Sequence, residues 1–390
     1  MTQLSFHHII QIKLSFSFSF FSLFKGSSIL NHFKSLQMKK KMKLKNSNIF
    51  IFFSFFLFST CWCLLEVEMQ RDSTHYFAYV DSEKGKDNPN NFFSTSLEFA
   101  PTWKTLQFAM DTLTSSNTKN NSTFTIYLMS GIYSATSTIT NTNLNLHSNS
   151  SRNESFEISS IDVYLKMSPS KMFFLNSLYS SFTLKGISFQ EYQIDDSIIK
   201  ISSSNNLKIE KCLVKKNVLN APFLSTTKSN NITFSQVIFK DNQNKNEKTK
   251  GGIVLLDFTN NLVVFDSCIF SSNNADNING GVFINQLNSN TTFINSSFLN
   301  NNSSMGSAVY LKQKNIDTSF YNCSFIANSA YDGGSVLIYN NNEKTLFSGC
   351  SFINNKASND GGVMWVEKEN SIRIENSVFK SNIAFNNGTF

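Results

Sequence analysis

Residues 323–334 read C-S-F-I-A-N-S-A-Y-D-G-G, and this pattern of Phe-x-x-Asn followed by a glycine pair or a single glycine recurs to the end of the chain. Six copies are present, and successive phenylalanines are 31, 28, 27, 27 and 27 residues apart. Such a period is typical of stacked supersecondary units that bury their apolar faces on one another. The Phe/Asn pairs are Phe239/Asn242, Phe270/Asn273, Phe298/Asn301, Phe325/Asn328, Phe352/Asn355 and Phe379/Asn382, and the first following glycines are Gly251, Gly280, Gly306, Gly333, Gly361 and Gly388.

Each repeat contains short alternating runs of β-branched and aromatic residues, such as 262–265, 268–270 and 281–284, separated by Asn, Ser and Gly. This pattern favours strands and turns over helices. Three strands fit into about 27 residues, and with no helix between them each strand must pair with its copy in the next coil. The sequence therefore predicts an all-β, right-handed parallel β-helix solenoid with three strands per coil.

The repeated residues have distinct expected tasks in such a coil. The Phe points inward and stacks on its copy one coil away. The Asn marks the corner where the strand turns, because Asn tolerates left-handed backbone angles and stacked amides can hydrogen-bond along the axis. The glycine supplies a positive φ at the next corner.

Weaker copies extend the solenoid toward the N-terminus. Val214 takes the place of the Phe 25 residues before Phe239, and Phe189 lies another 25 residues back. We expect an N-terminal cap and first coil over residues 74–145 and β-helix repeats over 146–390. Because Gly388 should open another strand and no atypical repeat follows it, the sequence predicts a truncated C-terminus, with a tail or membrane anchor beyond it.

The repeats resemble those of the chlamydial polymorphic outer-membrane proteins and, more broadly, of the pectin-lyase-like β-helix superfamily. A second resemblance lies upstream, where Y-V-D at 79–81, W-K-T-L-Q at 103–107 and G-I-Y at 131–133 are similar to the usual opening of such folds. The resemblance implies that residues 101–113 form a helix that caps the open end, with one apolar face made of Leu106, Ala109, Met110 and Leu113. It implies the fold and leaves the role open among lyases, hydrolases, esterases, adhesins and structural proteins.

The N-terminal region has the composition of an export signal. Residues 1–45 hold eight lysines and no acid, which leaves about −1 for the remainder of a chain whose net charge is +7, so the repeats offer no basic surface for nucleic acid. A basic run at 39–45 precedes 17 apolar residues at 49–65. We predict a signal peptide or an uncleaved signal anchor over residues 38–65, with 1–37 as a gene-model extension.

Export would place the protein in the secretory pathway, secreted or at the cell surface. Sequons for N-glycosylation are consistent with that route if the source is a eukaryote, although Asn and Ser are abundant enough to produce many by chance. Membrane association would come only from a signal anchor or from a missing C-terminal segment. The sequons begin at Asn121, Asn149, Asn153, Asn231, Asn290, Asn295, Asn322 and Asn387.

Four of the six cysteines occupy one place in the repeat, two residues before the Phe or Val214, and the other two lie in the signal region at Cys61 and Cys63. Their parity points them into the core. Cys323 and Cys350 should lie in adjacent coils, close enough in Cα distance for a disulfide, but buried thiols acting as small hydrophobes are the favoured interpretation. The four are Cys212, Cys268, Cys323 and Cys350.

Few residues suit catalysis on the outer face. The best carboxylate pair is Asp195-Asp196, and neighbours in a strand point to opposite faces, so these two would cooperate only from a loop. No histidine follows His147, and Arg71, Arg152 and Arg373 are the only arginines. We interpret Asp195 and Asp196 as surface-turn residues and expect no cofactor or metal. A row of turn acids such as Asp332 and Asp360 could bind Ca²⁺, but the neighbouring Asn residues can do the same turn work without metal.

The sequence thus favours a non-catalytic adhesion, binding or structural module whose partners are extracellular glycans or surface proteins. A polysaccharide lyase or glycoside hydrolase is the alternative. Trp365 and Tyr310 are candidates for a sugar-stacking surface, with partly buried packing as the favoured interpretation.

Overall fold

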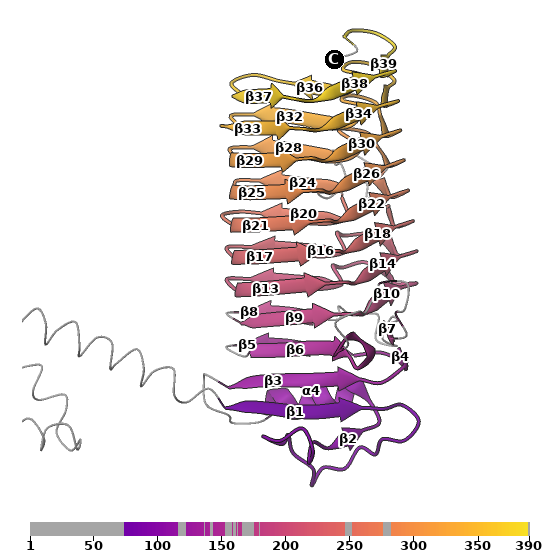
Figure 1. Cartoon of the computed structure of the whole chain (residues 1–390), viewed down its shortest axis with the longest axis vertical. Coiled ribbons are helices and arrows are strands. Elements are labelled where there is room, and N and C mark those ends of the chain that lie inside the picture. Colours follow the sequence, from indigo (N-terminus) through magenta and orange to yellow (C-terminus); the bar gives the residue numbers. More distant parts are fainter. Residues whose placement is uncertain are drawn as a thin grey trace, which may run out of the picture. The chain divides into compact units, whose positions relative to one another are not determined.

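The structure, a computed structural model, describes residues 74–115, 122–135, 137–140, 143–152, 158, 161, 163–165, 175–178, 180–245, 252–275 and 282–388. Its strands form four parallel sheets in which each strand pairs with its equivalents in the coils before and after it. Figure 1 shows the coils stacked in sequence order, from β1 (indigo) to β39 (yellow). The predicted signal region at 38–65 and the residues Gly251 and Gly280 lie outside the described residues.

Sheet A has 12 strands, nearly all in sequence order. They are β1 (His75–Val80), β2 (Thr102–Trp103), β3 (Thr123–Leu128), β6 (Asn143–Ser148), β9 (Ser181–Lys185), β13 (Asn205–Glu210), β17 (Asn230–Ser235), β21 (Asn261–Asp266), β25 (Ser289–Ile294), β29 (Ile316–Tyr321), β33 (Thr345–Ser348) and β37 (Ile372–Glu375).

Sheet B has ten strands and carries the repeated Phe. They are β4 (Gly131–Tyr133), β7 (Val163–Leu165), β10 (Ser188–Gln190), β14 (Leu213–Lys215), β18 (Ile238–Lys240), β22 (Ile269–Ser271), β26 (Ser297–Leu299), β30 (Ser324–Ile326), β34 (Ser351–Ile353) and β38 (Val378–Lys380).

Sheet C has nine strands and closes each coil. They are β5 (Ser137–Thr140), β8 (Leu175–Leu178), β12 (Ile199–Ser202), β16 (Leu224–Thr227), β20 (Val254–Asp257), β24 (Phe283–Gln286), β28 (Val309–Gln313), β32 (Val336–Asn340) and β36 (Met364–Val366).

A fourth strand per coil, only two residues long, was not expected from the sequence. It forms sheet D directly after the repeated Asn, because the two residues beyond that corner run extended and pair with their copies, as Asn302 does with Ser329. Its strands are β11 (Gln193–Ile194), β15 (Val218–Leu219), β19 (Gln243–Asn244), β23 (Asn274–Ala275), β27 (Asn302–Ser303), β31 (Ser329–Ala330), β35 (Lys356–Ala357) and β39 (Ile383–Ala384).

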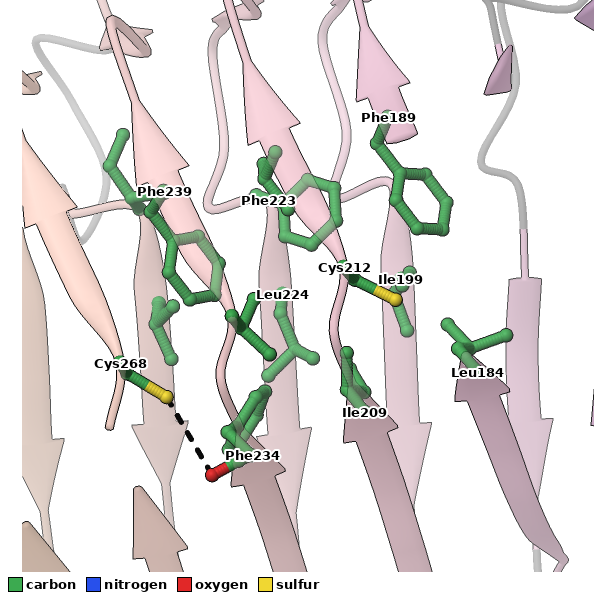
Figure 2. Close-up of a cluster of buried hydrophobic side chains, with 14 of the residues drawn as sticks. Leu184, Phe189, Ile199, Ile209, Cys212, Phe223, Leu224, Phe234, Phe239 and Cys268 are labelled. Carbon is green, nitrogen blue, oxygen red and sulfur yellow. Dashed lines mark hydrogen bonds between the residues drawn. The ribbon is translucent and has the colours of Figure 1, made fainter. Parts of the chain in front are cut away.

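The core contains two columns of phenylalanine. The repeated Phe stack on their copies one coil away, with ring centroids 4.7–5.0 Å apart from Phe239 to Phe379. A second column in sheet A, which the sequence interpretation missed, joins Phe234, Phe265, Phe293, Phe320 and Phe347 at 4.3–4.8 Å. Figure 2 shows part of this interior, where Phe239 and Phe234 lie among buried aliphatic side chains and Cys212 and Cys268.

The repeated Asn side chains hydrogen-bond along the axis, as the sequence predicted. The backbone N–H and side-chain amide of Asn273 both donate to Oδ1 of Asn301 at 3.1 Å, and Asn301 repeats this toward Asn328. The same pair of bonds joins every copy to the next, and half-buried Asn382 ends the column within the described residues. In chain order the members are Asn242, Asn273, Asn301, Asn328, Asn355 and Asn382.

A second column of asparagine, which the sequence interpretation missed, follows sheet C. Its members bond to one another in the same way, and each lies at the corner after a strand of that sheet. The amides of both columns satisfy backbone groups that the turns would leave unpaired inside the protein. The second column comprises Asn260, Asn288, Asn315, Asn342 and Asn370.

The expectation that the repeated Asn adopts a left-handed backbone conformation was wrong for all six copies: Asn242, Asn273, Asn301, Asn328, Asn355 and Asn382. The positive φ falls instead on the residue just before each of them, with values of 52–56°. The turn made by that residue directs the Asn side chain inward, where it bonds along the axis. The residues with positive φ are Asp241, Ser272, Asn300, Ala327, Asn354 and Ser381.

Glycine has its expected role at the next corner. There φ is positive at Gly333 (59°) and Gly361 (65°), and a Cβ at either position would lie 2.3–2.4 Å from a backbone oxygen. A larger residue would therefore require both a strained backbone and a shift of the neighbouring chain.

The one helix within the described residues is α4 (Leu106–Ser115), and its buried face comprises Leu106, Ala109, Met110 and Leu113. It starts later than the predicted residue 101 because Thr102 and Trp103 pair as β2 with β1. Thr105 then caps the helix, since its Oγ1 accepts from the Phe108 N–H at 3.2 Å. Its capping of the solenoid's open end stays a prediction.

Candidate functional site

The first strands of sheet A place aromatic side chains in register on their outer side. Tyr79 in β1 pairs with Tyr127 in β3, and Tyr127 pairs with His147 in β6. The residues on either side of each point into the core and are fully buried, because strand side chains alternate. The turn η1 (Ser150–Arg152) follows β6 and brings Arg152 to the same place. We call Tyr79, Tyr127, His147 and Arg152 the outer-face cluster.

The members of the outer-face cluster contact one another directly. The rings of Tyr79 and Tyr127 stack with centroids 5.6 Å apart, and His147 meets Tyr127 edge-on at 6.0 Å. The guanidinium of Arg152 lies 5.0 Å above the ring centroid of Tyr127, and its NH1 donates to the Tyr79 hydroxyl at 3.1 Å. These contacts orient the rings and the cation before any ligand arrives.

Polar groups continue this surface toward the start of the strands. The His75 Nε2 and the Thr125 Oγ1 are 2.7 Å apart, and the Asn145 amide donates to the same oxygen at 3.1 Å. His75 also stacks on Phe77, with ring centroids 4.5 Å apart. The outer side of these strands therefore offers aromatic faces beside hydrogen-bonding groups.

Burial keeps the histidine and tyrosine of the cluster neutral. It lowers the pKa of His147 to about 4, and the neighbouring charge of Lys185 adds to that effect. It also raises the pKa of Tyr127, an effect that Arg152 opposes. The Nε2 of His147 has no hydrogen-bond partner among the described residues. At neutral pH the positive charge of this surface thus resides on Arg152 and Lys185.

The arrangement suits binding better than hydrolysis. Flat rings with a guanidinium and an imidazole can stack on and hydrogen-bond to a polar ring or a planar group. Hydrolysis of a glycosidic bond commonly uses two carboxylates that flank the bond. The carboxylate that acts on His147 electrostatically is that of Glu210, which is itself paired with Lys208 at 2.6 Å.

Asp195 and Asp196 lie in the turn between β11 and β12, and their carboxylates contact different partners. Asp195 Oδ1 accepts from the Asn220 side-chain amide at 2.6 Å. Asp196 accepts from the Ser197 N–H at 2.8 Å and forms an ion pair with Lys200. These contacts fit the interpretation of the two residues as surface-turn residues.

Tyr310 and Trp365 belong to a second apolar cluster on the outer side of sheet C. Tyr310 is 3% exposed, and Leu337 lies between the two aromatic residues in register. Burial raises the pKa of the Tyr310 hydroxyl to about 12. Tyr310 is therefore a packing residue, and half-buried Trp365 lies at the end of that row.

The turn acids of the later coils bond to neighbouring loops. Asp332 Oδ1 accepts from the Asn359 side-chain amide at 2.8 Å and from the Asp360 N–H at 3.2 Å, and Asp360 Oδ1 accepts from the Asn387 N–H at 2.9 Å. Within the described ranges, no group of three or more acidic, histidine or cysteine side chains is placed to hold a metal. In that same part of the chain, no helix has the length and apolar character needed to span a membrane.

The sequence interpretation missed the outer-face cluster, although it had noted each member. Tyr79 lies 48 residues before Tyr127, and Tyr127 lies 20 before His147. No period links them, so the only signal was that all three occupy outward positions of neighbouring short strands.

No protein-family model and no curated protein matches the chain. Among solved structures, it is similar to ORF18 of Geobacillus virus E2, with 13% identity over 80% of this chain and a TM-score of 0.45. The catalytic domain of a GH87 alpha-1,3-glucanase in complex with tetrasaccharides matches at 12% identity over 75% and a TM-score of 0.43. PfbA, a surface adhesin of Streptococcus pneumoniae, matches at 11% identity over 72%, covering 74% of that protein, with a TM-score of 0.41.

The chain spans 60% and 59% of the length of the first two of these structures. The structural neighbours include pectin-lyase-like β-helix proteins. Both catalytic proteins and an adhesin occur among them, so the likeness concerns the fold and leaves the role open. The resemblance to the chlamydial repeats stays a prediction.

Proposed function

We propose that residues 74–388 form a non-catalytic binding module of a secreted or cell-surface protein. Its ligand is an extracellular glycan, held on the outer-face cluster. The observation that carries this proposal is the preassembled contact among Tyr79, Tyr127 and Arg152, in which a guanidinium bridges two stacked rings on an outward sheet face. Sugars commonly bind proteins through aromatic stacking supplemented by hydrogen bonds.

The alternative is a polysaccharide lyase or glycoside hydrolase of the pectin-lyase-like type. A neutral histidine and two tyrosines on one face could transfer protons, and that observation keeps the alternative in view. The separate partners of Asp195 and Asp196 favour binding over hydrolysis at that pair.

Purified full-length protein would be tested against a panel of neutral and acidic polysaccharides, with retention and chain cleavage scored together. We expect retention without cleavage. Tyr127→Ala and Arg152→Ala should each weaken binding about tenfold, which corresponds to about 1.4 kcal/mol. Tyr331→Ala is the matched control, because this tyrosine is 57% exposed and lies in a distant coil, and it should leave affinity unchanged.

Three outcomes would overturn the proposal in different ways. Cleavage that disappears in Asp195→Asn or Asp196→Asn would make the protein an enzyme with those residues at its site. Retention that survives both Tyr127→Ala and Arg152→Ala would place the ligand elsewhere. No retention on any polysaccharide would leave a structural or protein-binding role.

Export through the signal segment at 38–65 belongs to the same proposal. The sequon residues Asn231, Asn290, Asn295 and Asn322 are exposed corner residues with φ of 49–55°, so their side chains are accessible to modification. Expression in a eukaryotic secretory host should give protein in the medium whose mass falls on treatment with an N-glycosidase. Retention of unmodified protein inside the cells would contradict this route.

A further inference from the structure

The cysteines form part of one inward column at the entrance to sheet B. The column position is occupied in successive coils by Ile187, Cys212, Val237, Cys268, Ser296, Cys323, Cys350 and Ser377. Each of these carbonyls except the last accepts a hydrogen bond from the residue that follows the next member, as the Cys323 carbonyl does from the Ser351 N–H at 2.9 Å. Every member except the last is therefore stacked directly on the next coil.

Only one pair of cysteines is adjacent in this column. Val237 separates Cys212 from Cys268, and Ser296 separates Cys268 from Cys323. Cys323 and Cys350 occupy neighbouring coils, because the residues after them, Ser324 and Ser351, are partners in β30 and β34. Strands paired this way are about 4.8 Å apart, which lies within the Cα separation of disulfides, about 4.4–6.8 Å.

The two thiols already interact. All four described cysteines are buried thiols, and Figure 2 shows Cys212 and Cys268 in separate coils, with the Cys268 thiol 3.6 Å from the Phe234 carbonyl oxygen. Cys323 and Cys350, by contrast, share a hydrogen bond. That bond, together with burial, raises the pKa of Cys323, and it lowers the pKa of Cys350. Cys350 is thus the thiol of the pair that ionises more readily.

Cys350 also lies near the less buried end of the described solenoid. One further strand of sheet B, β38, covers it, and Val378 in that strand is 56% exposed. Opening of this last coil alone would give a small reagent access to Cys350, and terminal coils open at lower free energy than the core.

We propose that Cys323 and Cys350 form a disulfide that joins two adjacent coils when the protein meets an oxidising thiol–disulfide mixture. The Cys350 thiolate attacks one sulfur of a small disulfide such as oxidised glutathione, forms a mixed disulfide and releases one glutathione thiolate. The Cys323 thiolate then attacks the Cys350 sulfur and releases the second. Two protein thiols are oxidised and one glutathione disulfide is reduced to two thiols. The proposal does not depend on what the outer-face cluster binds.

The test uses the full chain, reduced and then equilibrated with mixtures of oxidised and reduced glutathione. Free thiols are trapped by alkylation, and peptides are mapped by mass spectrometry. We expect a Cys323–Cys350 linked peptide, with Cys212 and Cys268 alkylated. Because the bond closes a loop of 28 residues in the unfolded chain, the oxidised protein should melt several degrees higher, roughly 2–8 °C.

Serine is the natural replacement for the control variants, because the column already contains serine. Ser296 Oγ accepts from the Cys268 N–H, and Ser377 Oγ accepts from the Cys350 N–H, both at 3.1 Å. Cys323→Ser and Cys350→Ser should fold and lose the oxidation-dependent rise in melting temperature. Cys268→Ser should keep it. Cys323 and Cys350 that stay alkylated at every glutathione ratio, or that pair instead with Cys61 or Cys63, would overturn the proposal.

Discussion

The outer side of sheet A differs between its first strands and its later ones. Tyr79, Tyr127 and His147 are followed in the same register by Lys185 and Glu210, and then by Ser235, Asp266 and further unlike residues. Inside the sheet the later coils repeat one residue type per position, as the phenylalanine columns show. Repetition along the axis thus marks residues that hold coils together, whereas an unrepeated cluster on the outer face marks a place suited to a ligand.

The largest expected effect tests the repeated interior. Phe298→Ala removes a ring that is fully buried and stacked on Phe270 at 4.8 Å and on Phe325 at 5.0 Å. The resulting cavity should lower the free energy of unfolding by about 3–5 kcal/mol, measured by urea denaturation. The control is Phe99→Ala, whose ring is 74% exposed. Equal effects of the two substitutions would mean that stacking along the axis does not stabilise the solenoid.

The next effect concerns the asparagine columns. Asn301→Ala deprives Asn273 of the acceptor for two donors and the Phe270 carbonyl of a donor at 2.9 Å, all within the core. Buried polar groups without partners are costly, so the free energy of unfolding should fall by about 2–4 kcal/mol. Asn386→Ala removes an exposed amide bond of 3.1 Å to Asn359 and should cost less than about 0.5 kcal/mol. A smaller loss for Asn301→Ala than for Asn386→Ala would contradict the structural role of the column.

A third, pH-dependent effect belongs to the outer-face cluster. The folded-state pKa of His147 is about 4, against 6.5 for the ordinary side chain, so between these values the unfolded chain binds a proton that the folded chain does not. The stabilisation is fully present above pH 6.5 and is lost as the pH falls toward 4. Wild type should therefore lose up to about 3 kcal/mol more than His147→Gln between pH 7 and pH 4.

The groups that act on His147 are Lys185, Glu210, His75 and Lys208. His75→Gln is the comparison variant, because the pKa of His75 is lowered by burial alone. Denaturation curves of wild type and both variants at several pH values separate the two histidines. Parallel pH profiles for wild type and His147→Gln would show that this imidazole is not held neutral.

The smallest effect is expected at the acidic turn. Asp195→Asn and Asp196→Asn alter half-buried or exposed side chains whose bonds reach only Asn220, Ser197 and Lys200. Each should change the free energy of unfolding by less than about 0.5 kcal/mol and leave polysaccharide retention unchanged. A large loss of retention in either variant would move the site from the outer-face cluster to this turn.

The sequence predicted the stacked coils because a repeated residue at a fixed period can only meet its own copy. That logic succeeded for the Phe239–Phe379 column and could have found the second column, since Phe265, Phe293, Phe320 and Phe347 each lie five residues before a repeated Phe. It identified the bonding of the repeated Asn but not the backbone angles, because the turn depends on the variable residue just before each Asn, such as Asp241, Asn354 or Ser381 before Asn242, Asn355 and Asn382.

The outer-face cluster could not be found by the same logic. Contact between Tyr127 and Arg152 depends on the pairing register of the first coils and on the turn at Ser150–Arg152. Neither is periodic, so no repeat in the sequence signals that these side chains meet.

The one-way orientation of the asparagine columns also bears on how such a chain can change length. Each amide oxygen accepts from the coil before it and each amide nitrogen donates to the coil after it, so every interior coil presents the same two faces to its neighbours. Duplicating or deleting one whole coil leaves matching faces on both sides of the join, whereas losing a single residue shifts every later column out of line. A complete coil is therefore the unit in which homologous chains should gain or lose residues.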